Sequence, residues 1–102
     1  MNIEVKILRN EHGRPAGKLA DAEIHFIAGE LTGLKLVGFT IWERRDGNGI
    51  SVTFPARQFF FHGDKRNFAL LRGITNPNAQ NRARDLVLRA YEQLQGAVHA
   101  VS

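Results

Sequence analysis

Arginine and lysine side chains gather between residues 57 and 89. This segment carries seven basic residues and two acids, a net charge of +5, whereas the rest of the chain nets −1. A guanidinium group donates two parallel hydrogen bonds to a phosphate, so clustered arginines suit a polyanion. A charge run can equally be a solvated face that only keeps a protein soluble. The candidate phosphate-binding residues are Arg57, Lys65, Arg66, Arg72, Arg82, Arg84 and Arg89.

Three consecutive phenylalanines, Phe59 to Phe61, stand inside this basic segment. Exposed aromatic rings beside arginines can stack on unpaired bases. A run of aromatic residues can also be divided between a core and a subunit interface. We favour the interface, because a flexible loop would otherwise expose a large apolar area.

The remaining reactive side chains form no recognisable catalytic or metal-binding pattern. The chain has no cysteine, and its four histidines are scattered without ligand spacing. No serine stands with a histidine and an acid in a recognisable order. The sequence Gly47-Asn48-Gly49 lacks the third glycine and the following helix of a dinucleotide-binding loop. We therefore expect no enzyme, no metal, no cofactor and no small-molecule substrate.

Length and composition are those of one small domain spanning residues 1–102. The 14 lysines and arginines exceed the 10 acids, a net charge of +4 that favours acidic partners such as nucleic acid. The absence of cysteine fits a reducing compartment. The N-terminus has no signal pattern, and no apolar run approaches the roughly 20 residues of a membrane helix. We expect a cytoplasmic protein without a membrane partner.

Strands are predicted wherever apolar residues alternate with polar ones. They cover 3–7, a stretch that opens at Leu19 and ends before Gly29, and the segments 34–42 and 50–54. Segment 34–42 is apolar on both faces, which is typical of a central or interface strand. One of its faces would carry Leu34, Leu36 and Trp42, and the other Val37, Phe39 and Ile41.

The second half of the chain begins with a strong turn signal. The sequence Asp46-Gly47-Asn48-Gly49 predicts a hairpin, because these residues tolerate positive φ. A loop or short hairpin follows at 58–67, and we place Lys65 and Arg66 on it as a mobile loop. A short apolar run at 68–71 is the last predicted strand.

A helix is expected after Asn76, which is a good N-cap when Pro77 occupies the first turn. Gly96 is a plausible stop, with a frayed tail at 97–102. Strands followed by one helix indicate an α+β class, an antiparallel sheet of about five strands with a C-terminal helix packed on one face. The apolar stripe of this helix is Ala83, Leu86, Val87, Ala90, Tyr91 and Leu94.

Several motifs fall in order along the second half of the chain. They are Asn48-Gly49, Phe54-Pro55-Ala56-Arg57, Ile74-Thr75-Asn76-Pro77, Arg82, Leu86-Val87-Leu88 and Tyr91. Together they resemble the stage V sporulation protein G (SpoVG) family, which has methionine, serine and histidine where this chain has Phe54, Ala56 and Asn76. The resemblance implies a small bacterial homodimer that binds DNA and RNA and acts as a regulator.

We interpret the chain as a homodimeric nucleic-acid-binding regulator that uses an arginine-rich surface around its C-terminal helix. The alternative is a protein–protein interaction module, in which Trp42 and the phenylalanine run form a surface for a partner chain. A small-molecule enzyme is a more distant third possibility. Salt sensitivity separates the first two, because phosphate binding weakens with salt through counterion release and apolar docking does not.

Overall fold

The computed structural model describes residues 2–47 and 49–101, with side chains described as far as Leu94. Over these residues it contains six strands and one helix, which confirms the predicted α+β class. Four antiparallel strands form one sheet in the order β1-β2-β3-β4: β1 (Ile3–Arg9), β2 (Lys18–Phe26), β3 (Lys35–Glu43) and β4 (Ile50–Thr53). The strands β5 (Ala56–Phe61) and β6 (Asp64–Ala69) form a second, separate sheet, and the helix α1 (Ala79–Val101) completes the fold.

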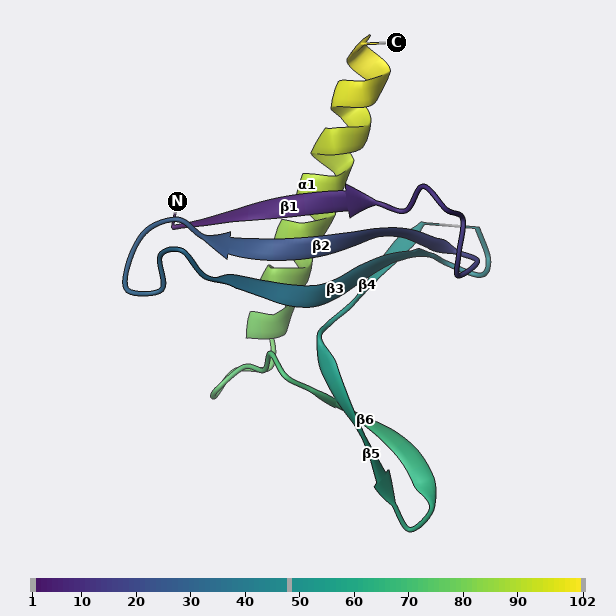
Figure 1. The fold of residues 1–102 in the computed structure, drawn as a ribbon, viewed down its shortest axis with the longest axis vertical. Coiled ribbons are helices and arrows are strands. Elements are labelled where there is room, and N and C mark those ends of the chain that lie inside the picture. The colour runs from purple at the N-terminus through teal and green to yellow at the C-terminus, as the bar shows by residue number, and fades with distance from the viewer. Residues whose placement is uncertain (1, 48, 102) are drawn as a thin grey trace.

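The core lies between the four-stranded sheet and α1, which crosses one face of that sheet (Figure 1). Inward positions alternate along β2 and along β3 from Phe39 onward, as a sheet with one covered face requires. The ring of Phe39 is fully buried and meets Phe54 edge to face, with 5.3 Å between the ring centroids. The buried members of this core cluster are Ala20, Ala22, Ile24, Phe39, Ile41, Val52, Val87 and Tyr91.

Strand β3 is central, as predicted, but its two faces differ from those expected. Phe39 pairs with Ala22 and Leu36 pairs with Ile24, so β3 spends one more residue than β2 over this stretch. Such a bulge reverses the alternation of side chains. Leu36 therefore packs on the core side with Phe39, and the prediction that the two point to opposite faces is wrong.

Gly38 lies in this bulge of β3, next to the segment that follows β4. Its φ is +110°, a conformation that favours glycine. A Cβ atom at Gly38 would lie 3.0 Å from the Cβ of Pro55, which directs the chain away from the sheet. The backbone at Gly38 therefore packs closely against Pro55, in the segment between the four-stranded sheet and the second sheet.

The second sheet is a hairpin that projects away from the four-stranded sheet (Figure 1). Its two-residue turn is His62-Gly63, with φ values of +51° and +82°, as a turn with two left-handed residues requires. The expected hairpin at 58–67 is confirmed, but its second strand runs over 64–69 and not 68–71. Lys65 and Arg66 lie on β6, so their placement on a mobile loop is wrong.

The helix begins as predicted but ends later. The Asn76 side chain accepts a hydrogen bond of 2.9 Å from the backbone N–H of Asn78, which is the pattern of an N-cap. The helix continues through Gly96 to Val101, so the predicted stop is wrong. A glycine inside a helix costs only about 1 kcal/mol relative to alanine. Ser102 lies outside the described residues.

Candidate nucleic-acid interface

Four basic side chains lie on the β5–β6 hairpin or directly after it. Arg57 belongs to β5, Lys65 and Arg66 belong to β6, and Arg72 lies in the loop that follows. All four residues are exposed. Asp64 is the one acid between residues 56 and 72, so this segment carries a net charge of +3. The hairpin therefore holds most of the positive charge that the sequence places between residues 57 and 89.

The register of the hairpin sorts its side chains onto two different faces. Paired residues share a face, and alternate residues of a strand do as well. The pairs Arg57 with Phe68, Phe59 with Arg66 and Phe61 with Asp64 therefore point to the same side. We call this side the aromatic–arginine face, made of Arg57, Phe59, Phe61, Asp64, Arg66 and Phe68. The opposite side carries Ala56, Gln58, Phe60, Lys65, Asn67 and Ala69.

Arginines cover two of the exposed rings on the aromatic–arginine face. The guanidinium carbon of Arg66 lies 5.4 Å from the ring centroid of Phe61. That of Arg72 lies 4.5 Å from the ring centroid of Phe68. A cation over an aromatic face is attracted by the ring quadrupole. These contacts position the guanidinium groups beside the rings without neutralising their charge.

The three candidate arginines of α1 do not form one surface. Arg82 and Arg89 are exposed and seven residues apart, two turns along one side of the helix. Arg84 is half-buried on the other side, with its guanidinium carbon 5.4 Å from the ring centroid of Phe54. Its Nη1 donates a hydrogen bond of 2.6 Å to Oδ1 of Asn81. Arg84 therefore helps to hold the helix against the sheet and is a poorer candidate for phosphate.

The outer side of α1 also carries acids. With about 100° between successive residues, Asp85 and Glu92 share the side of Arg82 and Arg89. These four exposed residues sum to zero charge. An alternation of signs along a helix is typical of a solvated face. The expected arginine-rich surface around the helix thus carries less net positive charge than the hairpin.

The ion pairs found between described residues lie in the first half of the chain. Among the described residues four ion pairs occur, all on strands β1 to β3. None of the four involves any of the seven candidate basic residues. The pairs are Lys6–Glu4 at 2.7 Å, Lys18–Asp21 at 3.0 Å, His25–Glu23 at 2.9 Å and Lys35–Glu23 at 3.3 Å.

Two of the carboxylates in these ion pairs have a lowered pKa. The hydrogen bond with His25 lowers the pKa of Glu23, and Lys35 acts in the same direction. The hydrogen bond from Lys6 lowers the pKa of Glu4. The positive charges of Lys6, Lys18 and Lys35 on the four-stranded sheet are therefore already matched by nearby carboxylates. That of the hairpin remains available to an external anion.

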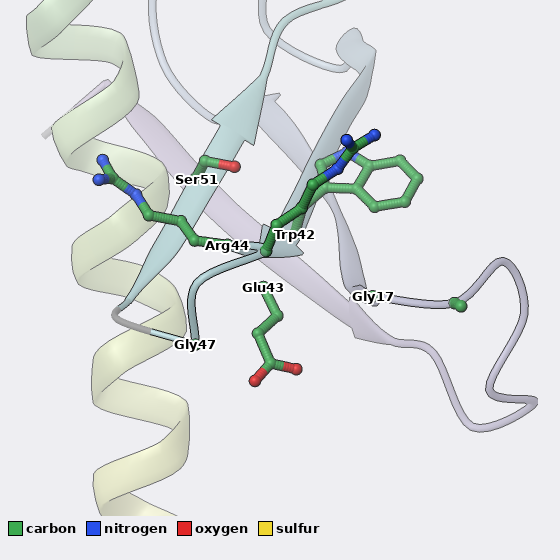
Figure 2. Close-up of a pocket in the computed structure, with 8 residues that line it drawn as sticks. Gly17, Trp42, Glu43, Arg44, Gly47 and Ser51 are labelled. Carbon is green, nitrogen blue, oxygen red and sulfur yellow. The ribbon is translucent and has the colours of Figure 1, made fainter.

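A shallow pocket lies at the turn between β3 and β4 (Figure 2). Figure 2 shows the side chains of Glu43 and Arg44 pointing in different directions. The indole N–H of Trp42 already donates a 3.2 Å hydrogen bond to Thr53. The Glu43 carboxylate and the Arg44 guanidinium group therefore do not face each other as an acid–base pair. It is lined by Ala16, Gly17, Trp42, Glu43, Arg44, Arg45, Gly47 and Ser51.

Two further features are absent from the described part of the chain. It contains no group of three or more histidine, cysteine, aspartate or glutamate side chains that could hold a metal ion. No helix within it has the length and apolar character needed to cross a membrane.

Sequence reasoning missed Phe68 as a member of the candidate site, and it missed the separation of Phe60 from its two neighbours. A signal for both was present. If His62-Gly63 is a two-residue turn, Phe61 pairs with Asp64, and pairing the residues one by one away from the turn places Phe68 opposite Arg57. This pairing follows only if residues 58–67 form a hairpin, and the sequence is compatible with either a hairpin or a loop there.

Comparison with known proteins does not place the chain in a family. No family model matches the sequence, and neither a curated protein nor a solved structure matches it significantly. The resemblance to the SpoVG family therefore stays a prediction from the motifs between residues 48 and 91.

Proposed function

We propose that this protein is a regulator that binds nucleic acid, DNA or RNA, through its basic side chains and performs no chemistry. One observation carries the proposal. The seven basic residues between 57 and 89 take part in none of the ion pairs found among the described residues, whereas four basic groups of the sheet do. Unmatched cations on an exposed, projecting element are the electrostatic footprint of a polyanion-binding protein.

Binding of this kind follows from counterion release. Each phosphate that a lysine or arginine neutralises frees condensed counterions, so affinity falls as salt rises. The hairpin cations would supply most of the contacts, and Arg82 and Arg89 would add to them. Arginine suits this task because its planar fork matches a phosphate oxygen pair.

A salt-titrated binding assay against duplex DNA, single-stranded DNA and RNA tests the proposal. We expect Arg57→Ala and Arg82→Ala each to weaken binding and to flatten the slope of log affinity against log salt by about 0.7 to 0.9. Both residues are exposed, so the melting temperature should change little. Lys6→Ala is the matched control, because Lys6 is a cation already paired with Glu4. Unaltered binding in the Arg57→Ala/Arg82→Ala double variant, with the fold intact, contradicts the proposal.

The proposal includes a homodimer and a cytoplasmic location. Apolar side chains are exposed on the loop between β2 and β3 and on β3 itself, notably Leu31, Leu34 and Val37 at 51%, 60% and 51%. The paired part of β3 next to β4 covers only Thr40–Glu43. The stretch 35–37 thus lies beyond the end of β4, and an open strand edge is a template for a second chain. Light scattering at micromolar concentration tests the dimer, and a monomer mass contradicts it.

A protein-interaction module remains the second candidate, on the observation that Phe60 is 75% exposed. In that case binding to a partner chain should be insensitive to salt, because apolar docking releases no condensed counterions. Trp42 contributes less to this alternative than expected, since it is half-buried with its N–H already bonded.

A further inference from the structure

We propose that the aromatic–arginine face is a stacking platform for single-stranded nucleic acid. This inference rests on the proposed function and narrows its ligand to strands with unpaired bases. The observation behind it is the sorting of the hairpin side chains. Phe59, Phe61 and Phe68 stand on one side together with Arg57 and Arg66, and Phe60 stands alone on the other.

The three rings of this face are available to a ligand. Phe59, Phe61 and Phe68 are 39%, 51% and 46% exposed. Phe59 and Phe61 are two residues apart on an extended strand, which separates their side chains by about 6.8 Å. This is about twice the 3.4 Å rise between stacked bases in a duplex strand. The spacing therefore fits bases that are splayed from their neighbours and does not fit an intact stack.

A duplex cannot use such a platform. Its bases are stacked on one another and present only their edges in the grooves. Unpaired bases offer their π faces, and each base has one, so stacking on phenylalanine tolerates many sequences. The rings thus favour single strands, while the cations by themselves would accept any phosphate backbone.

Two arginines that lie over rings of this face have a second role. Arg66 and Arg72 lie over the rings of Phe61 and Phe68. A cation–π contact at an exposed site is weaker than the stacking of a base on a ring. An incoming base can therefore displace the guanidinium group, which then lies within reach of the adjoining phosphate. One cation–π contact is thus replaced by two contacts, the base stacked on the ring and the guanidinium group on the phosphate.

Charge decides between nucleic acid and a second copy of this chain on the face. The face carries Arg57, Arg66 and Asp64, and Arg72 lies over its Phe68, so these four charges sum to +2. A two-fold contact would bring this face against its own copy, so two surfaces of net positive charge would meet. The central parts of protein interfaces are also depleted in charged residues, whereas here the rings alternate with guanidinium groups. A polyanion with aromatic bases matches both features.

Fluorescence titration with single-stranded oligonucleotides that contain 2-aminopurine tests the platform, because stacking quenches that base. The key variants are Phe59→Ala, Phe61→Ala and the double variant Phe59→Leu/Phe61→Leu, which keeps apolar side chains but removes the aromatic faces. We expect each lost ring to lower single-strand affinity by roughly 5- to 150-fold and to reduce the quenching. Duplex binding should change much less. Phe60→Ala, on the opposite side, is the matched control and should bind as the wild type does.

The outcomes separate this inference from the function on which it rests. Single-strand affinity and quenching that survive in the Phe59→Leu/Phe61→Leu variant overturn the platform. If the salt slope still depends on Arg57 in that case, nucleic-acid binding stands without it. If the wild-type protein binds no nucleic acid at low salt, both proposals fall. A variant that changes from dimer to monomer while its binding is unaltered identifies the face as a subunit contact and also overturns the platform.

Discussion

The four-stranded sheet with its helix and the β5–β6 hairpin use the same kinds of residue in opposite ways. In the sheet, Phe39 and Ile41 are fully buried under α1. In the hairpin, every residue of β5 is exposed, including three phenylalanines. Apolar residues in this small chain are therefore of two kinds. Those of the sheet under α1 are buried and build the core, whereas those of the hairpin are exposed and do not.

Charge divides in the same way between the two regions. Cations on β1, β2 and β3 lie beside carboxylates, and those of the hairpin lie over rings or in solvent. An isolated two-stranded hairpin is marginally stable. Its turn and its cation–π contacts support it, but little else among the described residues covers it (Figure 1). A region built in this way is better suited to contacting a partner than to stabilising the fold.

The sharpest way to break this contrast is the same substitution in each region. Phe39→Ala should lower the free energy of unfolding by about 3–5 kcal/mol, because it leaves a cavity in a fully buried site. Phe60→Ala should change it by less than about 0.5 kcal/mol, because that ring is 75% exposed. Chemical denaturation measures both. Similar losses in the two variants would show that the hairpin belongs to the cooperative core.

The junction between the two regions gives the next largest effect. Gly38→Ala should cost about 1–3 kcal/mol, because the residue has a φ of +110° and its new Cβ would press on Pro55. Gly33→Ala is the matched control, with a φ of +91° and no atom within 4 Å of its new Cβ. Thermal melts compare the two. Equal destabilisation would mean that the Pro55 contact does not anchor the hairpin.

Two neighbouring helix residues sharpen the border of the core. The Val87 side chain is fully buried, with an exposed fraction of 0%, whereas Leu86 is half-buried at the edge of the apolar stripe. Val87→Ala removes two buried carbon groups and should cost about 2 kcal/mol. Leu86→Ala should cost less, although leucine is larger. A urea titration that ranks Leu86 above Val87 would show that α1 is rotated on the sheet.

The smallest effect concerns the paired charges of the sheet. The pKa of Glu23 is lowered by its hydrogen bond with His25 and by Lys35. A carboxyl whose pKa is lower in the folded state stabilises the protein above its unfolded pKa of about 4.3. This contribution is lost as the pH falls through the folded-state value. Glu23→Gln should flatten the decline of stability below about pH 4.5. An identical acid profile in the variant would mean that the pair contributes nothing.

The sequence predicted the class, the helix start and the strands of the sheet because these depend on local signals. Asn76 caps the helix through a neighbour two residues away, and the period-two pattern of β2 is local as well. The bulge at Gly38 could not be read in this way. It lies where Pro55 approaches from the segment between β4 and β5, and it places Leu36 on the other face.

The candidate site was predicted in composition but not in arrangement. The charge pattern and the SpoVG-like motifs indicate seven basic residues, and the structure divides them between the hairpin region and two sides of α1. Arg84 lies over Phe54, a contact that no local spacing indicates. The acids at 85 and 92 offset the outer arginines only once helical geometry is taken into account. Charge counting along the chain cannot separate these cases.

The salt dependence of single-strand binding in an Arg57→Ala/Arg66→Ala variant tests most directly whether the hairpin is the binding region. Both residues lie on the aromatic–arginine face and outside the core. We predict that the slope of log affinity against log salt flattens by about 1.4, or 0.7 for each lost phosphate contact, with an unchanged melting temperature. Lys6→Ala, which removes a paired cation of the sheet, should leave the slope as it is. An unchanged slope in the double variant, or an equal change in the control, would contradict the division of the molecule into a structural sheet and a binding hairpin.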